Sequence, residues 1–136
     1  MNIYLYTDGA SRGNPGEAGI GVVILGENGS ALDTYFEYIG TATNNVAEYK
    51  ALVAGLKLTE KYIPCSVQVF MDSELIVNQM KGSYKVKAEN LIEWHFKASQ
   101  SAIKFDKINF EHIPRKKNIT ADKLANYAID TKKIFK

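Results

Sequence analysis

Apolar residues recur along the chain with two spacings, one typical of strands and one typical of helices. Segments rich in Ile, Val, Tyr and Phe predict five strands, one each at residues 2–8, 66–72 and 107–114 and two within residues 19–40. Asn28-Gly29 lies between the two strands of the last segment, and this dipeptide favours a tight hairpin turn.

The helical spacing predicts four helices, at residues 44–62, 73–82, 88–103 and 118–130. We expect Asn44 or Asn45 to cap the first helix, Gly82 to end the second and Asn118 to cap the last. One side of the third helix carries a set of mostly apolar residues, namely Ala88, Leu91, Ile92, Phe96 and Ser99.

The order of these elements predicts an α/β fold. An antiparallel meander of three strands comes first, and strand–helix units then add two parallel strands with right-handed crossovers. The result is a mixed five-stranded sheet flanked by helices. With 136 residues, we expect a single domain over residues 1–136.

Composition narrows the protein class. Hydrophobic residues make up 46% of the chain, which argues against disorder, and the net charge of +2 permits a polyanionic partner. Cys65 is the one cysteine, so no intrachain disulfide can form and a cytoplasmic location is expected. No apolar run approaches the roughly 18 residues of a membrane span, and the start of the chain has no signal-peptide pattern. No obligate protein partner is evident.

Four acidic residues occupy ends of predicted elements. Asp8 ends the first strand, Asp72 ends the fourth strand, and Glu48 and Asp122 lie near the starts of two helices. Functional sites of α/β sheets gather at the carboxyl ends of strands, so these side chains are expected to meet. Clustered carboxylates repel, and a divalent cation such as Mg²⁺ or Mn²⁺ removes this penalty. Two such ions held together indicate phosphoryl-transfer chemistry.

Each acid also has a purely structural interpretation. Asp72 can cap the helix that follows it, and Glu48 lies three residues after Asn45, at the spacing of a capping box. Asp122 can simply favour the positive end of its helix. Asp8 is the hardest to explain in this way, because a charge at the end of an apolar strand is costly to bury without a partner.

Four stretches together resemble the successive motifs of type 1 ribonuclease H, from about Ile3 to Asp130. They are YTDGASRGNPGEAGIGVVI, TATNNVAEYKAL, FMDSELIVNQ and HIPRKKNITADKLANYAID. The resemblance implies a ribonuclease H-like fold and an endoribonuclease that cleaves the RNA strand of RNA–DNA hybrids. It further implies a two-metal-ion mechanism that leaves 5′-phosphate and 3′-hydroxyl ends. Metal binding and catalysis would then fall to Asp8, Glu48, Asp72 and Asp122, with two Mg²⁺ ions and Mn²⁺ as the alternative.

A protein that recognises the ribose 2′-hydroxyl needs its own backbone close to the ribose and small polar groups beside it. We expect these from two places, the loop after Asp8 and the start of the long helix. The candidate residues are Gly9, Gly13, Asn14, Asn44 and Asn45. Thr43 resembles the family residue that helps to seat a DNA-strand phosphate. Turn geometry explains the glycines equally well, and helix capping explains Thr43.

The chain departs from many family members because it lacks the basic helix–loop insertion called the handle. It also shows no N-terminal hybrid-binding module. Hybrid affinity is then expected either to be weaker or to rest on a set of cations, Lys81, Lys85, Lys87 and residues 115–117. A solvated face is an equally good interpretation of the lysines. Glu74 stands where the family often has Gln, and its charge would repel phosphate.

A second departure concerns catalytic assistance. Several family members carry a histidine before the last metal-binding acid, but no histidine lies between Pro114 and Asp122. His112 is expected inside a strand. The chain resembles the handle-less archaeal and bacterial branch, which implies that Arg115 assists catalysis, with a phosphate contact as the alternative.

Three other functions remain for comparison. Proofreading-type exonucleases usually carry an acid two residues after the first aspartate, where this chain has Ala10. A non-catalytic nucleic-acid-binding domain would not need all four acids. The sequence does not distinguish a nuclease specific for hybrids from a broader nuclease that also cuts double-stranded RNA or RNA–DNA junctions.

Overall fold

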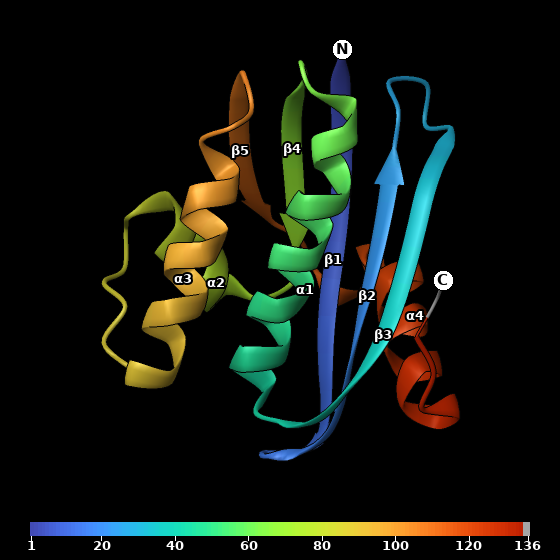
Figure 1. Ribbon diagram of the computed structural model, residues 1–136, viewed down its shortest axis with the longest axis vertical. Coiled ribbons are helices and arrows are strands. Elements are labelled where there is room, and N and C mark those ends of the chain that lie inside the picture. Colours follow the sequence, from blue (N-terminus) through green and yellow to red (C-terminus); the bar gives the residue numbers. More distant parts are fainter. Residues whose placement is uncertain (135–136) are drawn as a thin grey trace.

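A five-stranded sheet forms the centre of the molecule in the computed structural model, which describes residues 1–134 (Figure 1). The strand order across the sheet is β3-β2-β1-β4-β5. The strands are β1 (Asn2–Gly13), β2 (Gly16–Leu25), β3 (Ala31–Ala42), β4 (Ser66–Met71) and β5 (Lys107–His112). Strands β1, β2 and β3 pair antiparallel, whereas β4 and β5 pair parallel to β1 and to each other. The predicted mixed sheet is confirmed.

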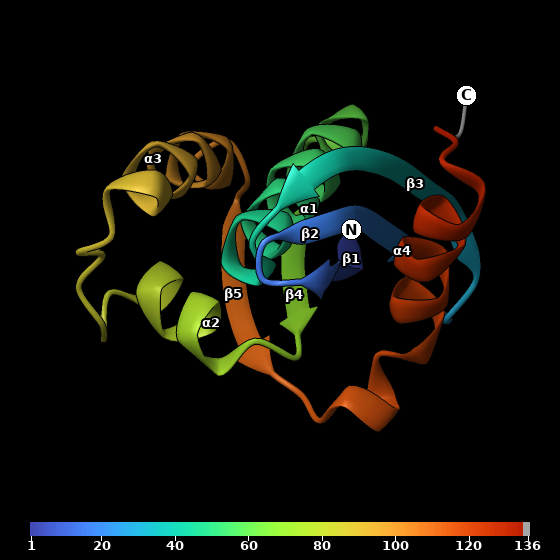
Figure 2. The same ribbon diagram turned by 90° about the horizontal axis from the view of Figure 1, so that it is seen from below.

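Four α-helices accompany the sheet within the described residues: α1 (Asn44–Thr59), α2 (Glu74–Lys81), α3 (Glu89–Ala102) and α4 (Ile119–Thr131). Two short 3₁₀ turns, η1 (Glu60–Tyr62) and η2 (Arg115–Lys117), follow α1 and precede α4. Helices α1 and α3 cover one face of the sheet and α4 covers the other (Figures 1 and 2). None of the helices in residues 1–134 is both long and apolar enough to cross a membrane.

The main core lies between the sheet and α1. Ile3 and Leu5 of β1 and Leu52 and Leu56 of α1 are completely buried there. Burial of apolar side chains on this scale is the main favourable contribution to folding. It fixes α1, and with it the carboxylate that α1 carries, against β1.

Helix α4 packs unusually close to β2 on the opposite face. A methyl group at Gly21 would lie 2.1 Å from the backbone oxygen of Ala121, and one at Gly19 would lie 2.4 Å from that of Ala125. Only glycine leaves room for this backbone approach. The two glycines therefore set how near α4 comes to the sheet.

The prediction that the first strand ends at Asp8 is wrong, because β1 continues to Gly13. Glycine is unfavourable in strands, so the glycines within residues 9–13 favour a loop in the sequence. In the folded protein residues 9–13 continue the ladder with β2, from Gly9 opposite Ile20 to Gly13 opposite Gly16. Asp8 thus lies inside a long strand.

Several helix ends also differ from prediction. Helix α1 is capped by Thr43, whose hydroxyl oxygen accepts the Val46 N–H at 3.3 Å, and not by Asn44 or Asn45. Helix α2 begins after Ser73, which caps it, so Asp72 is free of that role. The predicted end of α2 at Gly82 is confirmed, and its φ is +82°.

The mostly apolar side of α3 is only partly buried. Ile92 and Phe96 are 50% and 59% exposed, and the helix packs instead through Leu91, Ala98 and Ala102. When a helix has apolar residues on adjacent sides, the elements packed against it determine which of these residues become buried.

Candidate active site

Asp8 lies where the parallel part of the sheet ends. Strand β1 pairs with β4 only as far as Tyr6 opposite Phe70, whereas its pairing with β2 continues past Asp8. One edge of β1 is therefore open at Asp8, and Asp72 follows directly after β4 at the same level. The carboxyl ends of these parallel strands bring the two acids together although β1 itself continues.

Glu48 reaches the site from α1. Its Oε1 atom accepts the N–H of Gly9 at 2.8 Å, and only 8% of the residue is exposed. A methyl group at Gly9 would lie 2.2 Å from the backbone carbon of Ala47, so β1 and α1 touch through their backbones here. Glu48 is the fifth residue of α1 and its carboxylate binds Gly9, so the capping-box interpretation is wrong.

Asp8, Glu48 and Asp72 form one cluster. Each offers a carboxylate oxygen, and these atoms lie within 4.8 Å of one another. Burial first, and then the neighbouring carboxylates of Glu48, Asp72 and Asp122, raise the pKa of Asp8 to about 10. Burial and the Asp72 carboxylate raise the pKa of Glu48 to about 8, against the opposing effect of the Gly9 N–H.

This cluster suits a divalent cation. Its donors are oxygens only, the set that Mg²⁺ and Mn²⁺ prefer in proteins. The raised pKa values show that the protein alone does not stabilise several negative charges here, and a bound cation supplies that stabilisation. The residues present therefore fit the metal that their chemistry implies.

Asp122 lies at the side of the cluster, in the first turn of α4. Its Oδ1 atom is 3.5 Å from the Arg115 guanidinium and accepts the Asn126 side-chain N–H at 3.3 Å. The Arg115 side chain is 78% exposed, so most of it faces solvent. A guanidinium in this position can meet an incoming phosphate as well as Asp122.

An open cleft of about 470 Å³ gives access to these groups. Its lining includes the four acids and Arg115, together with Gly9, Ala10, Ser11 and Asn44. The sequence did not single out Ser11, which faces the cleft as part of β1. Its hydroxyl donates to the backbone oxygen of Ala42 at 2.7 Å and so ties β1 to the end of β3.

Of the predicted substrate-binding residues, Gly9 and Asn44 line this cleft. The Asn14 side-chain oxygen accepts the Asn44 N–H at 3.1 Å, which joins the β1–β2 turn to the start of α1. Thr43 lies beside this contact as the α1 cap, and Asn45 is exposed in the first turn. Gly13 has a φ of +107° and does not line the cleft, so turn geometry accounts for it.

Asn118 is the main residue of this region that sequence reasoning missed. It occupies the cap position of α4, as predicted, but its side chain forms no capping bond. Its Nδ2 atom donates instead to the Thr7 backbone oxygen at 2.9 Å and to Asp72 Oδ2 at 3.2 Å. In the sequence, Asn118 is an asparagine four residues before an acid. That pattern indicates a helix cap and not a contact with Asp72.

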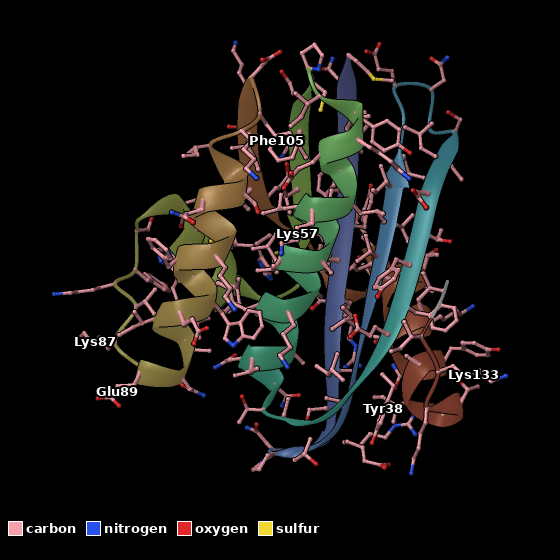
Figure 3. All side chains as sticks on the ribbon, viewed as in Figure 1. Tyr38, Lys57, Lys87, Glu89, Phe105 and Lys133 are labelled. Carbon is pink, nitrogen blue, oxygen red and sulfur yellow. The ribbon has the colours of Figure 1, made fainter. Side chains whose placement is uncertain are left out.

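Of the predicted hybrid-binding cations, only Arg115 lines the cleft. Lys81 ends α2, and Lys85 and Lys87 lie on the short connection to α3, where no handle helix is present. Lys87 projects away from the molecule (Figure 3). His112 is exposed at the end of β5, and His95 of α3 lies 3.3 Å from the Gln79 backbone oxygen, in a structural position.

Residues 6–128 match the model of the Reverse transcriptase-like family. The bifunctional protein Rv2228c of Mycobacterium tuberculosis is 44% identical over 96% of this chain, and this chain spans 36% of that protein. A ribonuclease H of Clostridium botulinum is 30% identical over 94% of this chain and 95% of its own length.

Solved structures agree with these matches. RNase H1 from the archaeon Halobacterium salinarum superimposes with a TM-score of 0.93, at 36% identity, over 96% of this chain and 99% of that chain. LC11-RNase H1, solved in complex with an RNA/DNA hybrid, gives a TM-score of 0.92 at 48% identity, over 96% of this chain and 98% of that chain.

Proposed function

The chain belongs to the type 1 ribonuclease H family, and on this basis we propose that it hydrolyses the RNA strand of RNA–DNA hybrids. The observation that carries the proposal is the cluster of Asp8, Glu48 and Asp72 at the cleft. A similar structure contains an RNA/DNA hybrid, which supports this substrate class. We propose products with 5′-phosphate and 3′-hydroxyl ends.

Asp8, Glu48 and Asp72 are the proposed metal ligands, with Asp122 completing the set. Two bound Mg²⁺ ions, or Mn²⁺ in their place, would supply Lewis-acid activation of a water and stabilisation of the leaving oxygen. The protein holds the carboxylates in advance through backbone contacts. Gly9 fixes Glu48, and the end of β4 fixes Asp72. Such preorganisation lowers the cost of assembling the reactive arrangement.

Recognition of RNA is proposed for the end of the cleft near α1. Asn44 lines the cleft, and Asn14 and Thr43 hold the neighbouring backbone through capping bonds. Asn45 is a further proposed substrate contact, because it is exposed in the first turn of α1, next to Asn44. Gly9 contributes through close backbone packing, and Gly13 through the turn that carries Asn14.

Arg115 is proposed to contact the scissile phosphate and to assist catalysis. Its guanidinium lies at the cleft beside Asp122, and its side chain is largely exposed. We expect the Arg115→Ala variant to lose more in kcat than it gains in KM, because the interaction would act in the transition state. A change in KM alone would make Arg115 a binding residue only.

A panel of labelled substrates tests the proposed function and its alternatives. The wild-type protein is incubated with Mg²⁺ or Mn²⁺ and with RNA–DNA hybrid, double-stranded RNA, double-stranded DNA or an RNA–DNA junction. We expect internal cuts in the RNA strand of the hybrid. Equal cutting of double-stranded RNA would favour the broader nuclease, and binding without cutting would favour a non-catalytic domain.

The proposed place of action is the cytoplasm. Cys65 is buried and unpaired, as is usual for proteins of reducing compartments. The proposed partner is the nucleic-acid hybrid, whose phosphates would meet the exposed cations around the cleft.

A further inference from the structure

We propose that Asn118 is a positioning residue that holds three of the four acidic segments in register. The inference rests on the proposed metal site at Asp8, Glu48, Asp72 and Asp122. It concerns how the fold keeps these carboxylates together. Asn118 itself is not proposed to touch metal or substrate.

The contacts of Asn118 reach three separate parts of the chain. Its side-chain N–H groups donate to the backbone oxygen of Thr7, the residue before Asp8, and to the carboxylate of Asp72. Its own backbone oxygen accepts the N–H of Asp122 at 3.1 Å. One residue, only 1% exposed, thus connects the end of the β1–β4 ladder with the first turn of α4.

The hydrogen bonds of the Asn118 side chain argue against an ordinary role as a helix cap. An asparagine at a cap position normally accepts an N–H of its own helix. Here α4 has no side-chain capping bond, and Asn118 Oδ1 is buried without a hydrogen-bond partner among the described residues. Leaving a buried acceptor unpaired is unfavourable. The side chain therefore lies in this orientation because its donor atom meets Thr7 and Asp72.

A neutral amide donor suits this position. It bonds Asp72 Oδ2 and so limits rotation of that carboxylate, while it adds no positive charge that would compete with a cation. Hydrogen bonds from neighbouring groups orient metal-binding side chains in this way, and their loss typically weakens metal binding about 10- to 100-fold.

The test compares Mn²⁺ binding by calorimetry in the wild type and in the variants Asn118→Ala and Asn118→Leu. Ala opens space and Leu keeps the approximate volume, and both remove the donor. Gln79→Leu is the matched control, because Gln79 is another buried amide, bonded to the Tyr49 hydroxyl at 2.6 Å and absent from the cleft lining. Circular dichroism and thermal unfolding in EDTA establish that each variant is folded.

We expect both Asn118 variants to bind Mn²⁺ at least about 10-fold more weakly than the wild type, and the Gln79 variant to bind normally. We also expect a higher Mg²⁺ concentration to restore part of the lost hybrid cleavage. If folded Asn118 variants bind Mn²⁺ within twofold of the wild type, Asn118 is structural only and the inference is wrong. If the wild type itself binds no Mn²⁺, the proposed metal site fails, which is a different and recognisable result.

Discussion

In the folded state, the ionised forms of the Asp8 and Glu48 carboxyl groups are disfavoured. Both are buried against other carboxylates, and the pKa of each is raised, to about 10 for Asp8 and about 8 for Glu48. A free carboxyl group has a pKa near 4. The metal-free protein therefore keeps protons in the cluster at neutral pH, and those protons must leave before a cation can be bound by the carboxylates.

This shift predicts how the stability of the metal-free protein depends on pH. Between about pH 4 and pH 10 the folded state keeps a proton on Asp8 that the unfolded chain releases, so the free energy of unfolding falls as pH rises. We expect thermal unfolding in EDTA to occur at a lower temperature at pH 9 than at pH 6. In the Asp8→Asn variant, which cannot ionise there, this dependence should be weaker. An unchanged dependence in that variant would contradict the raised pKa.

The gathering of the four acids at one cleft could be predicted from the sequence, because each lies at the end of a predicted strand or near the start of a predicted helix. The role of Asn118 could not be predicted, because its partner Thr7 lies 111 residues away in the chain. The same holds for the hydrogen bond from Gly9 to Glu48. Contacts of this kind exist only once the sheet and helices have packed.

The position of helix α4 matters for the site because this helix carries Asp122. Gly19 and Gly21 let it approach β2, and Asn118 joins its start to the ends of β1 and β4. The sequence predicted this helix and its start well. It did not predict how closely the helix docks, because the approach of Gly19 and Gly21 to α4 exists only in the folded chain.

The Gly21→Ala variant tests the docking of α4. The added methyl group would lie 2.1 Å from the Ala121 backbone oxygen, so the helix must move away and carry Asp122 with it. We expect a loss of about 1–3 kcal/mol in the free energy of unfolding, measured in urea, together with weaker Mn²⁺ binding.

Gly26→Ala is the control, because its methyl group would meet only movable side-chain atoms, the nearest at 3.2 Å. We expect it to remain close to the wild type in both measurements. If Gly21→Ala and Gly26→Ala behave alike, the close approach of α4 does not govern the site.

In other elements, the spacing of apolar residues predicts some bounds and buried sides but not others. The alternation in β4 predicted its bounds closely, since the strand is buried on alternate residues. Strand β1 was predicted too short because its glycines and Asn14-Pro15 looked like one long turn. The sequence does not show which apolar residues of α3 become buried, because that depends on α1, its neighbour in the fold.

At the scale of the whole molecule, the four acids of the site are separated from most of the predicted hybrid-binding cations. The four carboxylates line the cleft, whereas the cations of α2, of its connection to α3 and of η2 are exposed, and of these only Arg115 lines the cleft. Such an arrangement suits a polyanion that binds through its phosphates and is cut where metal ions neutralise the acids. The net charge of +2 did not reveal this separation, because it depends on the fold.

Cleavage of a labelled RNA–DNA hybrid by the wild type and by the Asp72→Asn variant, in Mg²⁺, tests the central claim most directly. Asn keeps the shape of Asp but removes the negative charge from a proposed metal ligand. We predict internal cuts in the RNA strand by the wild type and no detectable cutting by the folded variant. Normal cutting by the variant, or an inactive wild type, would contradict the account.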